Sequence, residues 1–190
     1  MTVQDRDPDG NRSEEIGTSR EGPTEAAAGE LLTGAFENPV PDWDRYTIID
    51  YLGEGAMGLV YRALDPSLGR QVAIKFIASD DPDQKNRFQR EARAHAQIEH
   101  DHVCRVYEVG DVGGRAYIAM QLIDGSSLQD VASDLTLDQR VVVMEQVAEA
   151  VQAAHSMGVI HRDIKPGNIM VESRDGEGLH AYVLDFGIAR

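Results

Sequence analysis

The stretch Val159-Ile-His-Arg-Asp-Ile-Lys-Pro-Gly-Asn168 joins an apolar run to a polar turn. The turn carries Asp163, Lys165 and Asn168, so an acid, a cation and an amide lie close together in the sequence. Such groups suit phosphoryl transfer, because that reaction depends on positioning and on stabilising negative charge more than on covalent help from the protein. A loop with this role needs a phosphate-binding part elsewhere in the chain.

The composition is that of a globular protein with an acidic excess. The chain has 190 residues, of which 42% are hydrophobic, so it can bury a core of one domain or of one domain and a small second one. The formal net charge is −15, and residues 1–42 alone contribute −7. Lys and Arg are scattered apart from Arg87, Arg90 and Arg93, so we expect no nucleic-acid partner.

Targeting signals and cysteine usage point to the cytoplasm. No apolar run approaches the roughly 18 residues of a membrane span, and the acidic N-terminus lacks the basic and apolar regions of a signal peptide. Cys104 is the single cysteine, so it cannot form an internal disulfide. We therefore expect a cytoplasmic protein in which Cys104 is an inert, buried thiol.

The first half of the chain reads as an acidic tail followed by a small sheet. Residues 1–42 are predicted to be disordered, because they contain too little apolar surface to offset the entropy of ordering. Strands are predicted over 46–52, 59–64, 71–77, 103–109 and 115–122, with turn residues between them. A helix is predicted over 83–99, with its apolar face formed by Phe88, Ala92, His95 and Ile98.

The second half is predicted to be mainly helical. Residues 124–127 read as a linker, and residues 137–157 form the longest helical pattern, which Gly158 is placed to end. The apolar stripe of this helix is predicted to contain Val141, Met144, Ala148, Val151 and His155. Two short strands are expected at 169–171 and 181–184.

Two further features could serve phosphate binding, although each has an ordinary alternative. Gly53, Gly55 and Gly58 would let backbone amides approach phosphates closely, or they could form a simple β-turn. They lead into a strand, which fits poorly with a dinucleotide-binding fold. Lys75 lies in an apolar strand and would need a counterion if buried, for which Glu91 is the candidate; otherwise both side chains face solvent.

The order of these features gives a family resemblance. The segments 53–60, 72–75 and 161–168, together with Glu91 and 185–187, follow the order of the protein-kinase signatures. Over about residues 43–190 the chain resembles a eukaryotic-type (bacterial Hanks-type) Ser/Thr protein kinase. The resemblance implies an α+β fold, with a complete five-stranded N-lobe and one helix over 43–123 and a partial helical C-lobe over 124–190.

The resemblance also implies ATP and Mg²⁺ as cofactors and a protein substrate with a Ser or Thr acceptor. Asp163 would accept the proton of the substrate hydroxyl beside Lys165, Lys75 would hold phosphates while pairing with Glu91, and Asn168 and Asp185 would bind the metal. The residues expected around the nucleotide are Leu52, Gly53, Glu54, Gly55, Ala56, Met57, Gly58, Leu59, Val60, Ala73, Met120, Gln121, Leu122, Ile123, Met170 and Leu184.

The remaining histidines are interpreted as structural. His161 is expected to brace the loop that carries Asp163, while His100 and His102 could bind a metal in principle but fit better in a turn. The sequence ends three residues after Gly187, before the segments that complete a kinase domain. We expect the chain to be a truncated kinase with little or no activity toward proteins. The alternative is a catalytically inactive nucleotide-binding or partner-binding module.

Overall fold

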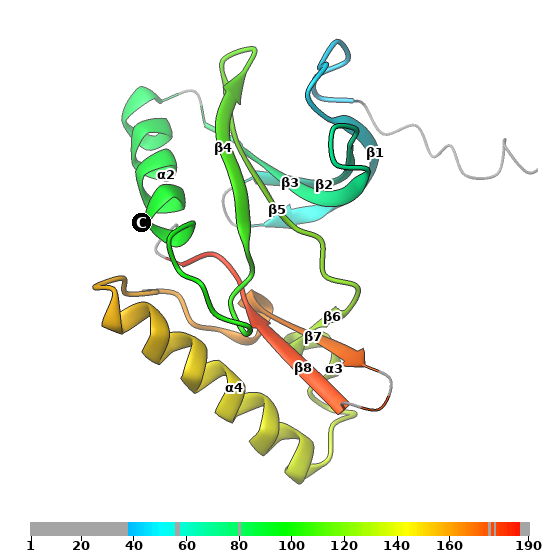
Figure 1. Cartoon of the computed structure of the whole chain (residues 1–190), viewed down its shortest axis with the longest axis vertical. Helices are drawn as coiled ribbons and strands as arrows, with labels where there is room; N and C mark the ends of the chain where they lie inside the picture. The colour runs from blue at the N-terminus through cyan, green and yellow to red at the C-terminus, as the bar shows by residue number, and fades with distance from the viewer. Residues whose placement is uncertain (1–37, 56–57, 80, 175, 177, 187–190) are drawn as a thin grey trace, which may run out of the picture. The chain divides into compact units, whose positions relative to one another are not determined.

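The computed structural model describes residues 38–55, 58–79, 81–174, 176 and 178–186 (Figure 1). Of the tail predicted to be disordered, residues 1–37 lie outside these residues, as do the expected roles of Ala56, Met57 and Gly187. Residues 38–42 are described and form a bend and a turn, without helix or strand.

A five-stranded antiparallel sheet forms the first part of the described chain, as predicted. Its strand order is β1-β2-β3-β5-β4, with the connections between sequence neighbours made by tight turns and by helix α2. The strands are β1 (Thr47–Gly55), β2 (Gly58–Asp65), β3 (Arg70–Ile77), β4 (Val106–Val112) and β5 (Arg115–Gln121). β3 and β5 are almost continuously buried, because they lie in the centre of the sheet and are covered on both faces.

Helix α2 (Pro82–His95) covers one face of this sheet, where it contacts β4 and β5 (Figure 1). Asp81 caps its N-terminus by accepting a hydrogen bond from the Asp83 amide, and Pro82 occupies the first turn, where its missing N–H costs nothing. Phe88, Ala92 and His95 are buried, as the predicted apolar face requires. The helix ends four residues before the predicted end, because the chain tightens into turns after His95.

A polar network fixes the segment before β1 to the sheet. The Glu108 carboxylate accepts hydrogen bonds from the hydroxyls of Tyr46 and Tyr117 and from Arg45 Nε, which lies at 3.1 Å. Arg45 also donates to Asp65, whose side chain is fully buried, at 2.8 Å. Arg45, Asp65 and Glu108 each have a partner in this network, so hydrogen bonds and ion pairs offset the cost of removing their charges from water. The network therefore orients the start of the sheet.

The second part of the described chain combines helices with a three-stranded sheet of order β6-β7-β8. Its elements are β6 (Ser126–Ser127), α3 (Leu128–Val131), α4 (Leu137–Ser156), the 3₁₀ turn η1 (Pro166–Asn168), β7 (Ile169–Arg174) and β8 (Gly178–Val183). Thr136 and Gln139 form a capping box at the start of α4. Gly158 ends the helix at φ 75°, a conformation that glycine adopts without steric cost.

The predicted apolar stripe of α4 was wrong. The helix packs on β8 with Val143, Val147, Ala150 and Ala154, which are at most 3% exposed. Of the predicted stripe, Val151 is half-buried, and Val141, Met144, Ala148 and His155 are exposed. Valine, alanine and methionine occur on more than one face of this helix, so the spacing of apolar residues did not identify the buried side.

Two other sequence interpretations also need correction. The segment predicted as a linker forms strand β6, which pairs with β7, and Ser127 caps the short helix α3. The predicted strand 103–109 begins only at Val106, because Val103 instead forms an isolated parallel bridge with Val183. There the Cys104 amide donates to the Val183 carbonyl at 3.0 Å, which ties the end of β8 to the approach to β4.

None of the helices in the described part of the chain is both long and apolar enough to cross a membrane.

Candidate active site

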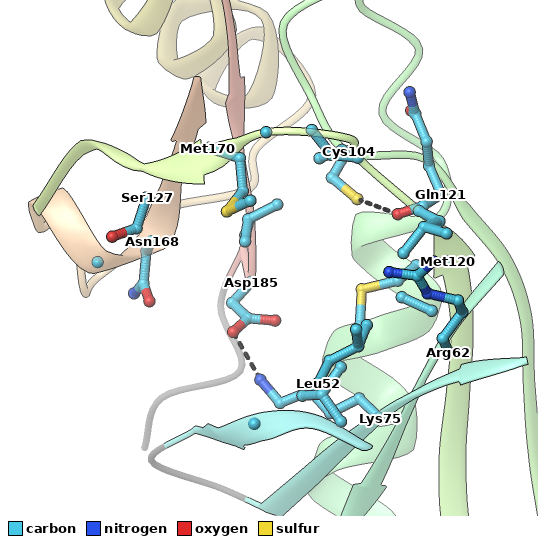
Figure 2. Close-up of a pocket in the computed structure, with 18 of the residues that line it drawn as sticks. Leu52, Arg62, Lys75, Cys104, Met120, Gln121, Ser127, Asn168, Met170 and Asp185 are labelled. Carbon is cyan, nitrogen blue, oxygen red and sulfur yellow. Dashed lines mark hydrogen bonds and ion pairs between the residues drawn. The ribbon is translucent and has the colours of Figure 1, made fainter. Parts of the chain in front are cut away.

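A cavity of about 650 Å³ contains most of the residues singled out from the sequence (Figure 2). It is bounded by β1, β2 and β3, by the segment after β5, and by the polar turn between α4 and β7. The predicted nucleotide residues that line it are Leu52, Gly53, Glu54, Val60, Ala73, Lys75, Met120, Gln121, Leu122, Ile123, Met170 and Leu184. Asp163, Lys165, Asn168 and Asp185 line it as well. Gly58, Leu59 and Glu91 are not among the lining residues in the described part of the chain, and the expected nucleotide role of Gly55 lies outside what is described.

Lys75 is the buried cation of this cavity. It is 4% exposed in the middle of β3, and its Nζ donates to Asp185 Oδ2 at 2.6 Å (Figure 2). Asp185 follows β8 and has φ 56°, a left-handed conformation that is uncommon for a residue other than glycine. The ion pair therefore links the central strand of the first sheet to the end of the second one.

The predicted pair between Lys75 and Glu91 is not formed. Glu91 Oε1 instead accepts from Arg87 Nε at 3.1 Å on the same helix, and Arg162 NH1 lies 4.0 Å away. Glu91 Oε2 is buried with no hydrogen-bond partner among the described residues. Two arginines compete for Glu91 while the Asp185 carboxylate satisfies Lys75, so the counterion expected from the sequence is replaced by another one.

The polar turn holds Asp163 through its neighbours in the sequence. Lys165 Nζ donates to Asp163 Oδ2 at 2.8 Å, and the Asn168 amide donates to the Asp163 carbonyl at 2.8 Å and to its Oδ2 at 3.1 Å. The hydrogen bond from Lys165 is the main reason why the pKa of Asp163 lies below its usual range, with Asn168 acting in the same direction. Asp163 is therefore ionised at neutral pH.

His161 supports the turn and has no free nitrogen for acid-base chemistry. It is 2% exposed; its Nε2 donates to the Leu184 carbonyl at 2.7 Å, and its Nδ1 accepts from the Asp163 amide at 3.2 Å. Burial lowers the pKa of His161, so the ring is neutral in this tautomer. The geometry agrees with the predicted bracing role.

Phe186 lies between two histidine rings from different elements. Its ring centroid is 4.7 Å from that of His161 and 5.3 Å from that of His95 on α2. Phe186 is fully buried, so the residue after Asp185 anchors that carboxylate to the core and to α2.

Gly58 is constrained by the sheet itself. It lies at φ 152°, and a Cβ atom at this position would stand 1.7 Å from the carbonyl oxygen of Phe76 on β3. No side chain fits there unless β2 and β3 separate. Gly53, at φ 156°, has no atom within 4 Å of the corresponding position.

Seven lining residues were not predicted: Arg62, Cys104, Asp124, Gly125, Ser127, Asp130 and Gly167. The spacing of Ser127 and Asp130 carried a usable signal, because a serine followed by an acid three residues later marks a helix start. The Asp130 amide indeed donates to Ser127 Oγ at 3.2 Å. Cys104 is buried with its thiol toward the Gln121 carbonyl, and burial raises its pKa to about 12, as expected of an inert thiol.

The donor set of the cavity suits a hard divalent cation. Asn168 uses its amide nitrogen toward Asp163, which directs its amide oxygen elsewhere, and Asp185 uses only Oδ2 toward Lys75. One carboxylate and one amide oxygen match Mg²⁺, which takes few protein ligands when phosphates supply others. His100 and His102 belong to a turn, and the described residues contain no group of three or more His, Cys, Asp or Glu that could hold a metal by themselves.

The fold is that of a protein kinase. The protein kinase domain family matches residues 46–190, so the chain belongs to this family. It is 41% identical over 171 residues to the serine/threonine-protein kinase PknJ of Mycobacterium tuberculosis, covering 87% of this chain and 27% of PknJ. It is 39% identical over 151 residues to pkn2 of Myxococcus xanthus, covering 77% of this chain and 18% of that protein.

Solved structures show the same fold. The kinase domain of Mycobacterium tuberculosis PknI has a TM-score of 0.67 and 32% identity, over 78% of this chain and 62% of that chain. The α+β fold with a five-stranded N-lobe and a partial C-lobe, predicted from the resemblance, is thereby confirmed. The chain spans about a quarter or less of the length of the curated relatives given above.

Proposed function

We propose that this chain carries the nucleotide site and catalytic loop of an ATP-dependent Ser/Thr protein kinase. The supporting observation is the facing arrangement across one cavity: Asp163, Lys165 and Asn168 on one side, Lys75 and Asp185 on the other. The reaction would transfer the γ-phosphoryl group of ATP to a Ser or Thr hydroxyl of a protein and release ADP.

The adenine ring would lie between apolar side chains from both lobes. Val60 and Ala73 line the cavity from the N-lobe, and Met170 and Leu184 line it from the C-lobe. The Gln121 amide is already bonded to the Arg105 carbonyl, and its own carbonyl accepts the Cys104 thiol. Leu122 and Ile123 have no described backbone hydrogen bond, so they are better placed than Gln121 to meet the polar edge of the base.

The transfer step would use Asp163 as the proton acceptor. Its lowered pKa keeps it ionised at neutral pH, so it can orient the attacking hydroxyl and take its proton as the oxygen–phosphorus bond forms. Lys165 would stabilise charge on the phosphoryl group beside it, and Lys75 would leave Asp185 to hold the phosphates. Asn168 and Asp185 would hold Mg²⁺, which supplies positive charge to the phosphates when bound.

Nucleotide binding gives the first test. Mg-ATP should raise the melting temperature of the purified chain, because a ligand that binds only the folded state stabilises it. Lys75→Met should reduce the shift strongly, whereas Arg115→Gln, an exposed arginine on β5 outside the cavity, should leave it unchanged. Absence of any shift with the unaltered chain would contradict a nucleotide site.

Phosphoryl transfer gives the second test. Because the chain is expected to be a truncated kinase, radiolabelled phosphate from γ-labelled ATP should reach a Ser/Thr peptide pool only slowly, and Asp163→Asn should lower this weak rate by about a hundredfold or more while the thermal shift with Mg-ATP persists. Equal rates for both proteins would rule out the role given to Asp163. Binding without any transfer would favour the alternative, a nucleotide-binding module.

A further inference from the structure

The described part of the chain has a second, smaller pocket of about 300 Å³. Among the described residues, Gln121 alone lines both this pocket and the nucleotide cavity. We call it the Arg105 pocket. Arg105, Tyr107 and Gln121 line it from the N-lobe strands β4 and β5 and the segment before β4, while Arg174, His180 and Tyr182 line it from β7 and β8. Six of its seven lining side chains carry hydrogen-bond donors, and the seventh is Asp101.

The wall from β7 and β8 is held in place by its own contacts. Arg174 Nε donates to Glu172 at 2.8 Å, and a second guanidinium nitrogen of Arg174 donates to the Tyr182 hydroxyl. The His180 ring lies with its centroid 4.4 Å from that of His102 and 4.7 Å from that of Tyr182. His180 Nε2 is 3.1 Å from the Asp101 carbonyl. These groups do not need to be ordered by a ligand.

The wall from β4 and β5 offers an arginine without a counterion. The Arg105 side chain is exposed, and within the described ranges no carboxylate lies within 4.0 Å of it. Its carbonyl accepts the Gln121 amide at 2.9 Å, which places Arg105 and Gln121 side by side. Arg70 stacks over the Tyr107 ring, with its guanidinium carbon 3.6 Å from the ring centroid, and its charge is paired with Asp65 at 3.7 Å.

Net charge does not explain what the pocket would bind. Glu172 offsets the charge of Arg174, and Asp101 opposes that of Arg105, so the charged side chains around the pocket cancel. On the β7/β8 wall, His180 Nε2 faces the Asp101 carbonyl and the Tyr182 hydroxyl donates to Glu172, so these donors are used within the protein. The side chains of Arg105, Tyr107 and Gln121 have no hydrogen-bond partner among the described residues, and a guanidinium beside a phenol and an amide suits an oxyanion such as phosphate.

We propose that the Arg105 pocket binds a phosphate group, with Arg105 as its principal contact and Asp101 as the opposing charge that limits affinity. The phosphate could be a free ion or part of a phosphorylated side chain, because the group recognised is the same. The proposal does not depend on phosphoryl transfer at the first cavity.

An NMR titration of the ¹⁵N-labelled chain tests this with sodium phosphate at constant ionic strength. Saturable shifts are expected at the amides of Arg105, Gln121 and Tyr182. Arg105→Gln should weaken binding about tenfold, because an arginine–phosphate contact is charge-assisted. Asp101→Asn should strengthen binding, because it removes the repelling carboxylate. The matched control Arg115→Gln, an exposed arginine outside both pockets, should bind phosphate as the unaltered chain does.

Two arms separate the alternatives. Lys75→Met should retain the phosphate-induced NMR shifts of the Arg105 pocket. Loss of phosphate binding in Lys75→Met, together with full binding in Arg105→Gln, would place the ion in the nucleotide cavity and overturn the proposal. Weaker binding by Asp101→Asn, or no saturable shift in the unaltered chain, would overturn it as well. Tighter binding of O-phosphoserine than of inorganic phosphate would identify a phosphorylated side chain as the source, and the reverse order would identify the free ion.

Discussion

His95 is a histidine in a position that suits an apolar residue. It is 2% exposed on α2, beside Phe186, and burial lowers its pKa to about 4 although the charge of Asp185 acts in the opposite direction. The neutral ring is therefore the form that the folded chain accepts. Protonation must be coupled to loss of stability, because the unfolded chain binds the proton more readily.

We expect His95 to make the folded chain sensitive to mild acid. The free energy of unfolding that depends on the neutral His95 ring is fully present above the unfolded pKa of about 6.5. It is lost as the pH falls toward about 4, and the loss amounts to about 3 kcal/mol. Urea unfolding of the unaltered chain and of His95→Leu should therefore diverge in pH dependence over this range, with the variant falling less steeply. Parallel curves would contradict the assignment, whatever the stability of the variant at pH 7.

Single residues differ in how far the sequence could place them. Asp163, Lys165 and Asn168 are close together in the chain, so local turn geometry was enough to bring their side chains into contact. Lys75 could be identified as a cation needing a partner, but its partner is Asp185, 110 positions away. Which of two distant carboxylates lies nearer depends on the packing of α2 and β8, and no local pattern records that packing.

Helix α4 illustrates how an element can be predicted while its orientation is not. Its length and its end at Gly158 were predicted, but the face that packs on β8 contains Val143 and Val147 instead of the predicted stripe. An apolar residue on the other side, such as Val142, is 42% exposed. β6 and α3 escaped prediction for a different reason: segments of two and four residues are too short to show a period.

Two valines of α4 give a matched measurement of this packing. Val147→Ala should lower the free energy of unfolding by about 2 kcal/mol, because it leaves a cavity against β8. Val142→Ala should change it by less than about 0.5 kcal/mol. The gain in helix propensity is the same in both variants and cancels in the comparison. Equal losses in chemical denaturation would contradict the packing of Val147 on β8, and a larger loss for Val142→Ala would show that α4 is packed on the other side.

The Lys75–Asp185 pair connects the two lobes, and its two members are unequally buried. The side chain of Lys75 is 5% exposed and that of Asp185 is 22% exposed. Removing the carboxylate leaves a buried cation without a counterion, whereas removing the cation leaves an anion that water can reach. The two single substitutions should therefore have different costs.

We expect Asp185→Asn to lower the free energy of unfolding by about 2 kcal/mol, somewhat less than for a fully buried pair. Asparagine is chosen because it tolerates the left-handed backbone at this position. Lys75→Met should cost less than about 1 kcal/mol, since methionine fills the same apolar surroundings without a charge. Guanidinium denaturation of both variants decides the order, and a larger loss for Lys75→Met would contradict it.

The contact between Gly58 and the backbone of Phe76 changes how a common experiment on this chain would have to be interpreted. Replacing a glycine of the loop proposed to bind phosphates by alanine is a standard way to ask whether the loop touches nucleotide. At position 58 the added methyl group would force β2 away from β3, so lost ATP binding would report a damaged sheet. Gly53 has open space around it, so the same substitution there would report on the loop itself, once its backbone strain is allowed for.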